Sequence, residues 1–149
     1  MSKAKKMVNS IGSSVDDAES SFYEALQNSD LERLMACWAD EDEVFCVHPG
    51  GPRLVGLGAI RAAFDAMFSN GNLRIQAQLV RKIDSMTCAV RSVRERIDIL
   101  THEGPVTAFV LATNVYFKTP QGWRMVAHHA SPGAANEAQD ITEVPPVFH

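Results

Sequence analysis

The chain has 149 residues, with 18 acidic and 14 basic side chains and a formal net charge of −4. This length suits one domain that buries about 70% of its unfolded surface, so that no disulfide or structural metal is needed for stability. A hydrophobic share of 46% and a charged share of 21% exclude a disordered chain. The apolar runs are too short to span a membrane, and the mild acidity argues against a nucleic-acid partner. Three cysteines, an odd number, favour a reduced, cytoplasmic protein.

The N-terminal half is predicted to be mainly helical. Residues 1–13 show no periodicity and are predicted to form a flexible tail, after which Ser14 is the expected N-cap of a first helix. Asp30 is the expected cap of a short second helix, and residues 44–48 form a short strand. A third helix is predicted within 60–71, where apolar side chains recur at intervals of three and four residues up to an Asn-Gly stop.

Beyond residue 71 the apolar period changes from 3.6 to 2, which predicts long strands joined by turns. These strands cover about 73–83, 87–100, 106–118 and 123–131. The polarity pattern breaks near Ser92, which predicts a bulge or a sharp bend there. Residues 133–149 are predicted to be a C-terminal tail, so that the folded domain covers 14–132. Helices followed by an antiparallel meander indicate an α+β fold with the helices on one face of a sheet.

The last hairpin assigns side chains to the two faces of this sheet. With pairing in phase across its turn, Thr113, Trp123 and His129 are predicted to face the helices. The opposite face is then predicted to carry Val110, Ala112, Asn114, Tyr116, Arg124, Val126, His128 and Ala130. That face is too apolar for a wholly solvated surface and predicts a homodimer formed sheet to sheet. A half-wet face that tolerates some apolar side chains is the alternative.

Three segments carry a resemblance to a known superfamily: FYEALQNSDLERLMACWAD (22–40), VHPGG followed by LVGLGAIRAAF (47–64), and ATNVYFKTPQGWRMVAHHASP (112–132). They resemble the superfamily of nuclear transport factor two, which includes ketosteroid isomerase, SnoaL-like cyclases and the association domain of calcium/calmodulin-dependent protein kinase II. The resemblance implies a cystatin-like cone, in which a strongly curved antiparallel sheet wraps around three N-terminal helices. This scaffold hosts enzymes, binding proteins and assembly modules, so the resemblance is specific for the fold and weak for function.

The resemblance also implies a position for a catalytic base. In ketosteroid isomerase an aspartate stands just before a proline at the end of the first strand, and His48 before Pro49 matches that position. The two oxyanion donors of the isomerase fall at Phe22 and near Thr113, so both are lost and steroid isomerisation by that mechanism is not expected. His48 is a candidate general base or acid, because a histidine changes its charge near neutral pH. A histidine that merely shapes the following turn is the alternative.

His128 and His129 are adjacent on a predicted strand, point to opposite faces and therefore do not suit one metal ion. His129 is predicted to face the concave side, where it would join His48 as a second catalytic candidate. No third ligand stands at metal spacing, so no metal or other cofactor is expected.

Ligand-binding candidates come from the strands and from the aromatic residues. Arg91 has the parity of Val93 and resembles a pocket arginine of the kinase association domain, which binds small carboxylates; an internal ion pair with Glu95 is the alternative. The other candidates are Tyr23, Trp38, Thr113, Asn114 and Trp123. Asn114 is expected either across a dimer contact or at the pocket rim, and the Tyr23 hydroxyl either in the cavity or on the surface.

Two functions are consistent with these residues. The first is a dimeric SnoaL-like protein whose internal pocket binds a small apolar or carboxylate-bearing organic molecule, with His48 assisting an isomerase, cyclase or hydratase reaction. The alternative is a non-catalytic association module that resembles the kinase domain. Neither a nucleic acid nor a membrane is an expected partner.

Overall fold

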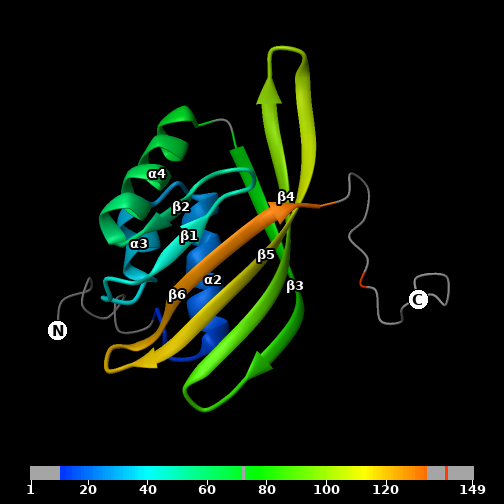
Figure 1. The fold of residues 1–149 in the computed structure, drawn as a ribbon. Coiled ribbons are helices and arrows are strands. Elements are labelled where there is room, and N and C mark those ends of the chain that lie inside the picture. The colour runs from blue at the N-terminus through cyan, green and yellow to red at the C-terminus, as the bar shows by residue number, and fades with distance from the viewer. Residues whose placement is uncertain (1–10, 72, 134–139, 141–149) are drawn as a thin grey trace, which may run out of the picture.

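A computed structural model describes residues 11–71, 73–133 and 140, and in these residues the helices lie on one face of a curved six-stranded sheet (Figure 1). The helices are α2 (Val15–Gln27), α3 (Leu31–Ala36) and α4 (Leu57–Asn70). The strands are β1 (Phe45–Val47), β2 (Arg53–Val55), β3 (Leu73–Asp84), β4 (Cys88–Thr101), β5 (Gly104–Thr119) and β6 (Gly122–Pro132). The predicted α+β class and the three helices are confirmed.

The strands lie in the order β2-β1-β6-β5-β4-β3. All neighbours are antiparallel except β1 and β6, which are parallel. The expectation of an antiparallel sheet is therefore corrected to a mixed one. The β1–β6 pairing joins the first and the last strands of the described residues, and it sets Cys46 beside His128.

The helix ends form where the sequence placed them. The Ser14 side chain accepts a hydrogen bond from the Asp17 amide at 3.1 Å, and the Asp30 carboxylate accepts one from the Arg33 amide at 3.1 Å. Each cap satisfies an amide that the first turn of a helix leaves without a partner. At the other end of α4, Gly71 adopts φ = 66°, a left-handed conformation that glycine takes without steric cost.

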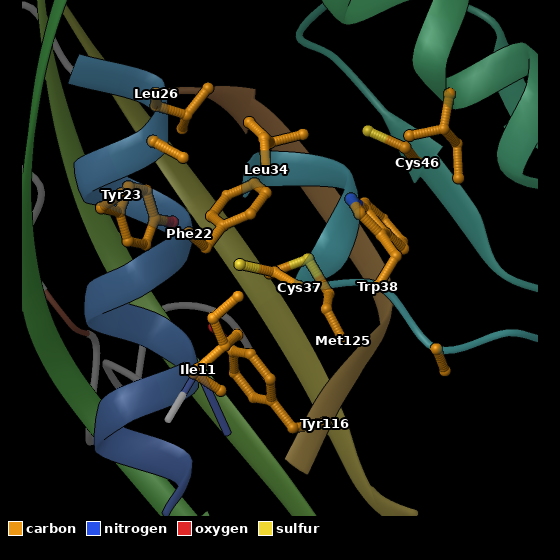
Figure 2. Packing of buried hydrophobic residues seen from close by; sticks show 14 of the residues in the cluster. Ile11, Phe22, Tyr23, Leu26, Leu34, Cys37, Trp38, Cys46, Tyr116 and Met125 are labelled. Carbon is orange, nitrogen blue, oxygen red and sulfur yellow. The ribbon is translucent and has the colours of Figure 1, made fainter. Parts of the chain in front are cut away.

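The core lies between the helices and the concave face of the sheet (Figure 2). Phe22 stands near its centre and makes edge contacts with Tyr23, Trp38 and Phe64, at ring-centroid distances of 5.1, 6.5 and 6.2 Å. Trp38 is buried, whereas Trp123 is half-buried against the same cluster. Edge-to-face contacts of this kind add to the stabilisation that burial gives.

The assignment of faces to the last hairpin is wrong for the whole of β5, where Asn114 and Tyr116 face inward, and for β6 beyond Val126. β6 contains an extra residue, Val126, that has no partner on β5. One extra residue reverses the alternation, so Met125 and His128 both face the helices although they are three residues apart. His129 consequently points away from the helices, together with its partner Thr113, and both are exposed. The side chains that were expected on an outer dimer face are instead mostly buried: Val110, Ala112, Asn114, Tyr116, Arg124, His128 and Ala130.

The bend expected at Ser92 lies on the neighbouring strand. The register of β3 against β4 shifts at Val80, opposite Ser92 and Val93, while β4 itself alternates without a break. Arg91 therefore faces inward with Val93, as its parity predicts.

The predicted tails fall largely outside the described residues, in 1–10, 134–139 and 141–149. Ile11 and Gly12, which were assigned to the N-terminal tail, are packed: Ile11 is buried and the Gly12 carbonyl accepts a hydrogen bond from the Trp123 amide at 2.8 Å. Among the described residues, no helix combines the length and apolar composition needed to cross a membrane.

Candidate functional site

Six buried polar side chains meet inside the cone, and we call them the polar core: Glu19, Tyr23, Glu95, Asn114, Tyr116 and His128. Glu19 and Tyr23 are one turn apart on α2 and therefore share its inner face. The other four come from β4, β5 and β6 and occupy inward positions of their strands. Helix and sheet thus bring together residues that are up to 109 positions apart, from Glu19 to His128.

Direct hydrogen bonds join four of these residues in a chain. His128 Nδ1 lies 2.5 Å from Asn114 Oδ1, and Asn114 Nδ2 donates to the Tyr23 hydroxyl at 2.9 Å. The Tyr23 hydroxyl in turn donates to Glu95 Oε2 at 2.7 Å. Next to this chain, the Tyr116 hydroxyl donates to Glu19 Oε2 at 2.8 Å. Buried polar groups need such partners, because an unsatisfied one would cost the free energy of its desolvation.

Burial shifts the pKa values of these groups in the direction that favours their neutral forms. Desolvation raises the pKa of the Glu19 and Glu95 carboxyls, although hydrogen bonds from Tyr116 and Tyr23 act against it. Desolvation also lowers the pKa of His128 to about 3, so that this imidazole is neutral at pH 7. The site therefore holds a neutral histidine and two carboxyls whose proton affinity is increased.

His48 follows β1 and lies beside the polar core. Its ring centroid is 5.1 Å from that of Phe64 and 6.3 Å from that of His128, and its Nε2 is 3.7 Å from Cys46 Sγ. Desolvation lowers the pKa of His48, so this half-buried imidazole is also neutral at pH 7. His48 therefore lies beside His128. The sequence predicted His129, the next residue along β6, in that place.

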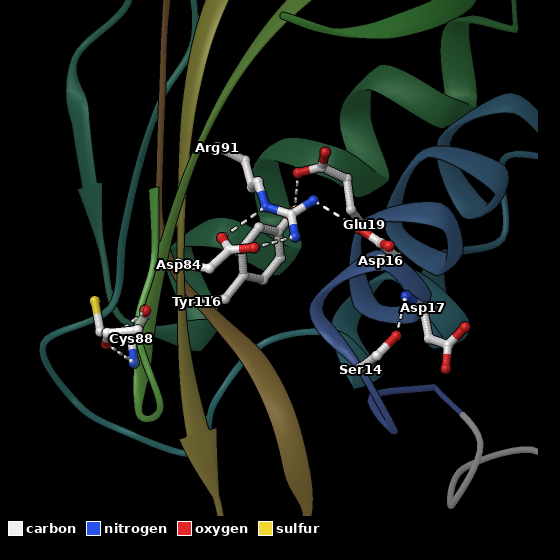
Figure 3. A network of polar contacts seen from close by, with 9 residues as sticks. Ser14, Asp16, Asp17, Glu19, Asp84, Cys88, Arg91 and Tyr116 are labelled. Atoms are coloured by element: carbon white, nitrogen blue, oxygen red, sulfur yellow. Dashed lines mark hydrogen bonds and ion pairs between the residues drawn. The ribbon is translucent and has the colours of Figure 1, made fainter. Parts of the chain in front are cut away.

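Arg91 connects β4 to the start of α2 (Figure 3). Its Nε and Nη2 donate to the two carboxylate oxygens of Asp84 at 3.0 and 2.8 Å, and its Nη1 donates to Asp16 Oδ1 at 2.8 Å. The pairing of Arg91 with Glu95 that the sequence left open is therefore wrong, since Glu95 binds Tyr23. All three guanidinium nitrogens have carboxylate partners, which explains how this cation tolerates burial.

A cleft of about 290 Å³, which we call the α2 cleft, opens between α2 and the strands β3 and β4. Glu19, Tyr23 and Arg91 give its lining a polar part, whereas Ala77, Leu79 and Val93 give it an apolar part. Its size approaches that of small-ligand sites, which start at about 300 Å³. A larger cavity of about 720 Å³ lies near Gly71, Leu73 and Leu100, and none of the predicted site residues lines it.

The structure brings together some of the predicted site residues and separates others. Tyr23, Asn114 and Arg91 face the interior, and Trp38 belongs to the buried core. Thr113 and His129 are exposed on the outer face. The sequence did not predict three of the site residues: Glu19, Glu95 and Tyr116. Glu19 could have been found, because it interrupts the apolar stripe of α2 one turn before Tyr23.

The sequence matches the SnoaL-like domain family over residues 15–135. The chain belongs to the SnoaL-like family. A search of curated proteins finds no match for this SnoaL-like chain. Among solved structures it is similar to a candidate calcium/calmodulin-dependent protein kinase type II association domain from Thiobacillus denitrificans, with 38% identity and a TM-score of 0.73 over 81% of this chain and 96% of that one.

Two further structures resemble this SnoaL-like protein. One is a candidate dehydratase of the NTF2-like family from Streptomyces avermitilis, with 32% identity and a TM-score of 0.71 over 81% of this chain and 95% of that one. The other is a ketosteroid isomerase-like protein from Erwinia carotovora atroseptica, with 15% identity and a TM-score of 0.69 over 80% of this chain and 94% of that one. At 15% identity the likeness shows the fold alone. Other similar structures are described as cystatin-like folds, which agrees with the expected cone.

Proposed function

We propose that this SnoaL-like protein binds a small organic acid in the α2 cleft and catalyses proton transfer on it, in a reaction of the isomerase or dehydratase type. The observation that carries the proposal is the composition of the cleft. The buried guanidinium of Arg91 lines it together with the Glu19 carboxyl and the Tyr23 hydroxyl, which can exchange protons with a ligand. Arg91 supplies a site for a carboxylate, and the apolar side chains supply contact for the rest of the ligand. The similarity to a candidate dehydratase with 32% identity supports this reaction class.

Glu19 is the group that we propose to transfer the proton. It lines the cleft, and burial raises the pKa of its carboxyl, which can therefore hold or release a proton as a general acid or base. His48 is the second candidate, because it is neutral and reaches the polar core from the β1 side. The Glu19→Gln and His48→Gln variants separate the two sites, because each replaces the ionisable group by a neutral amide.

The test is a ligand screen followed by proton exchange. Small carboxylates and cyclic ketones are screened by thermal shift, since a ligand that binds only the folded state raises the Tm. Bound ligands are then followed by NMR in D₂O for exchange of carbon-bound hydrogen. We expect Glu19→Gln to slow the exchange by about a hundredfold or more, as for the loss of a general acid or base. Exchange that depends on His48 and not on Glu19 would move the reaction to the β1 side, and a screen without any stabilising ligand would contradict the proposal.

Asp16 competes with the proposed ligand for Arg91. Its side chain is 73% exposed, whereas that of Arg91 is 3% exposed, so Asp16 can move into water while the arginine stays. We expect Asp16→Asn to bind small carboxylates several-fold more tightly, because its amide is a weaker competitor for the guanidinium. Isothermal titration with the best ligand of the screen measures this change. Asp17→Asn is the matched control, since it removes the same charge from the same turn without touching Arg91; an equal gain in both variants would contradict a specific exchange.

We further propose that the protein is a homodimer through the outer face of its sheet. Support comes from exposed apolar side chains at outward positions of β3 and β5, with exposed fractions of 75% for Ile83, 42% for Leu111 and 47% for Phe117. Exposed apolar side chains that share one face of a sheet are typical of an interaction surface. The non-catalytic association module remains the second candidate function, and it rests on this same face. The free thiols of Cys37, Cys46 and Cys88 support the proposal of a cytoplasmic location.

Light scattering at micromolar concentration tests the dimer. We expect twice the chain mass for the wild type and a shift to monomer for Phe117→Asp, because a charge buried at the centre of an interface has no partner. Met86→Asp places the same charge in the β3–β4 turn, where the native side chain is 87% exposed, and should leave the mass unchanged. A monomeric wild type would contradict both the dimer and the association function.

A further inference from the structure

We propose that Tyr116 is a positioning residue for Glu19: its hydroxyl holds the Glu19 carboxylate at the wall of the α2 cleft, in the ionised form that takes a proton from the ligand. This inference rests on the proposed function, because it assigns Glu19 the role of the base in that reaction. The bond between the two side chains does not depend on a ligand and is tested separately.

Helix and sheet fix these two side chains against each other (Figure 3). Tyr116 occupies an inward position of β5, where it is fully enclosed, and Glu19 lies on the inner face of α2. The Tyr116 hydroxyl oxygen is 2.8 Å from Glu19 Oε2. Glu19 is among the residues that line the α2 cleft, and Tyr116 is not. The hydroxyl therefore reaches the ligand site only through the carboxylate that it binds.

The hydrogen of this bond belongs to the tyrosine. Among the described residues, the Tyr116 hydroxyl has one hydrogen-bond partner, Glu19. Its single hydrogen is given to Oε2, because a buried hydroxyl without an acceptor would cost the free energy of its desolvation. Desolvation also raises the pKa of Tyr116 well above its ordinary value, so the hydroxyl keeps its hydrogen. A donor fixed in this way favours the carboxylate over the carboxylic acid.

The other groups around Glu19 divide into two sets. Burial raises the pKa of its carboxyl, and the hydrogen bond from Tyr116 is the strongest interaction that lowers it. A hydrogen bond from Asn114 and the charge of Arg91 act in the same direction as Tyr116, whereas the charge of Asp16 acts in the opposite one. Removing the hydroxyl leaves the other three groups in place, so that its effect can be measured alone.

The step assigned to Glu19 is a simple proton transfer. A carbon–hydrogen bond of the ligand breaks, its hydrogen passes to the carboxylate as a proton, and the electron pair stays on the ligand carbon. Return of a proton from the carboxyl to that carbon reverses the step, and in D₂O a deuteron returns. Only the ionised carboxylate can begin this cycle, so the rate of exchange should rise with pH through the titration of Glu19.

Carboxyl titration by NMR in protein labelled with ¹³C-glutamate tests the bond without a ligand, with the signals assigned by their loss in Glu19→Gln and Glu95→Gln. We expect Tyr116→Phe to move the titration of Glu19 to higher pH, because the ionised carboxylate loses a donor. Tyr23→Phe is the matched control: Tyr23, on the next turn of α2, gives its hydrogen to Glu95, so this variant should move the titration of Glu95 and leave that of Glu19 in place.

Replacement of both tyrosines by 3-fluorotyrosine, a more acidic phenol and a stronger donor, should move the titration of Glu19 in the opposite direction, to lower pH. This second measurement decides the inference if Tyr116→Phe does not fold. A Glu19 titration that stays in place in both labelled proteins, or that moves equally in Tyr116→Phe and Tyr23→Phe, would overturn the positioning role.

The role of Glu19 as the base is tested with pyruvate, a small carboxylate whose methyl hydrogens exchange in D₂O. We expect Tyr116→Phe to shift the pH profile of exchange to higher pH, with exchange about tenfold slower on its acidic side. In the Glu19→Gln background the same substitution should have no further effect, because the hydroxyl acts through the carboxylate. An unchanged pH profile in Tyr116→Phe, or an additional loss in the double variant, would overturn the inference. A wild type that does not accelerate exchange would instead count against the proposed function, while the titrations still decide the bond.

Discussion

Replacing Leu34 with alanine is expected to lower the free energy of unfolding by about 3 kcal/mol. Leu34 is the buried residue of α3, is fully enclosed and packs in the same cluster as Phe22 and Trp38. The lost methyl groups remove favourable transfer free energy, and the surrounding aromatic rings cannot collapse fully into the space that remains. Equilibrium unfolding in urea, followed by tryptophan fluorescence, measures the change.

Leu100→Ala is the control for the Leu34→Ala variant. The same atoms are removed from a side chain that is 66% exposed near the end of β4, so the expected loss is below about 1 kcal/mol. Comparable losses in the two variants would contradict the burial of Leu34 in the core cluster.

Lowering the pH from 7 to 5 is expected to cost about 2 kcal/mol of stability through His128 alone. Its pKa is about 3 in the folded protein against 6.5 for an unperturbed histidine, so only the unfolded chain takes up the proton in this range. The stability linked to His128 is complete above pH 6.5 and is lost as the pH falls toward 3. Glu19 and Glu95 act with the opposite sign, because their raised pKa values favour the folded state below 4.5 and cost stability as the pH rises through the folded values.

The share of His128 is isolated by comparing urea unfolding at pH 7 and pH 5 in the wild type and in His128→Gln. The glutamine amide can still donate to Asn114 but takes up no proton, so the variant should lose about 2 kcal/mol less than the wild type. His102→Gln, in the exposed β4–β5 turn, should behave as the wild type does. The same pH dependence in His128→Gln and in the wild type would show that the imidazole is not neutral and buried.

The helices could be predicted because their signals are local. Ser14, Asp30 and Gly71 each act within one turn of their own position, so a short window of sequence contains the whole interaction. The strands were likewise evident from an alternation of period 2. The parallel neighbour of β6 was not, because β1 is more than 70 residues away and three residues long.

The candidate site could be predicted only in part. Arg91 was found through the parity of a single strand, and Tyr23 through its residue type alone. His129 was chosen over His128 because the alternation was carried through Val126, and a one-residue bulge leaves no local mark on the sequence. The carboxylates that bind Arg91 come from the first turn of α2 and from the end of β3, far apart in the chain, so only the folded structure could identify them.

The place of β6 also bears on how the chain folds during synthesis. Of the strands in the described residues, β6 is synthesised last, yet it lies between β1 and β5 and joins the two parts of the sheet. Until residue 132 has left the ribosome, the β1–β2 hairpin has no strand beside it, and one side of β5 stays open. Contacts that close so long a loop form slowly, and unpaired strand edges are sites of aggregation. A chain released before β6 is made therefore exposes the edges of both β1 and β5. We expect such truncated products to aggregate.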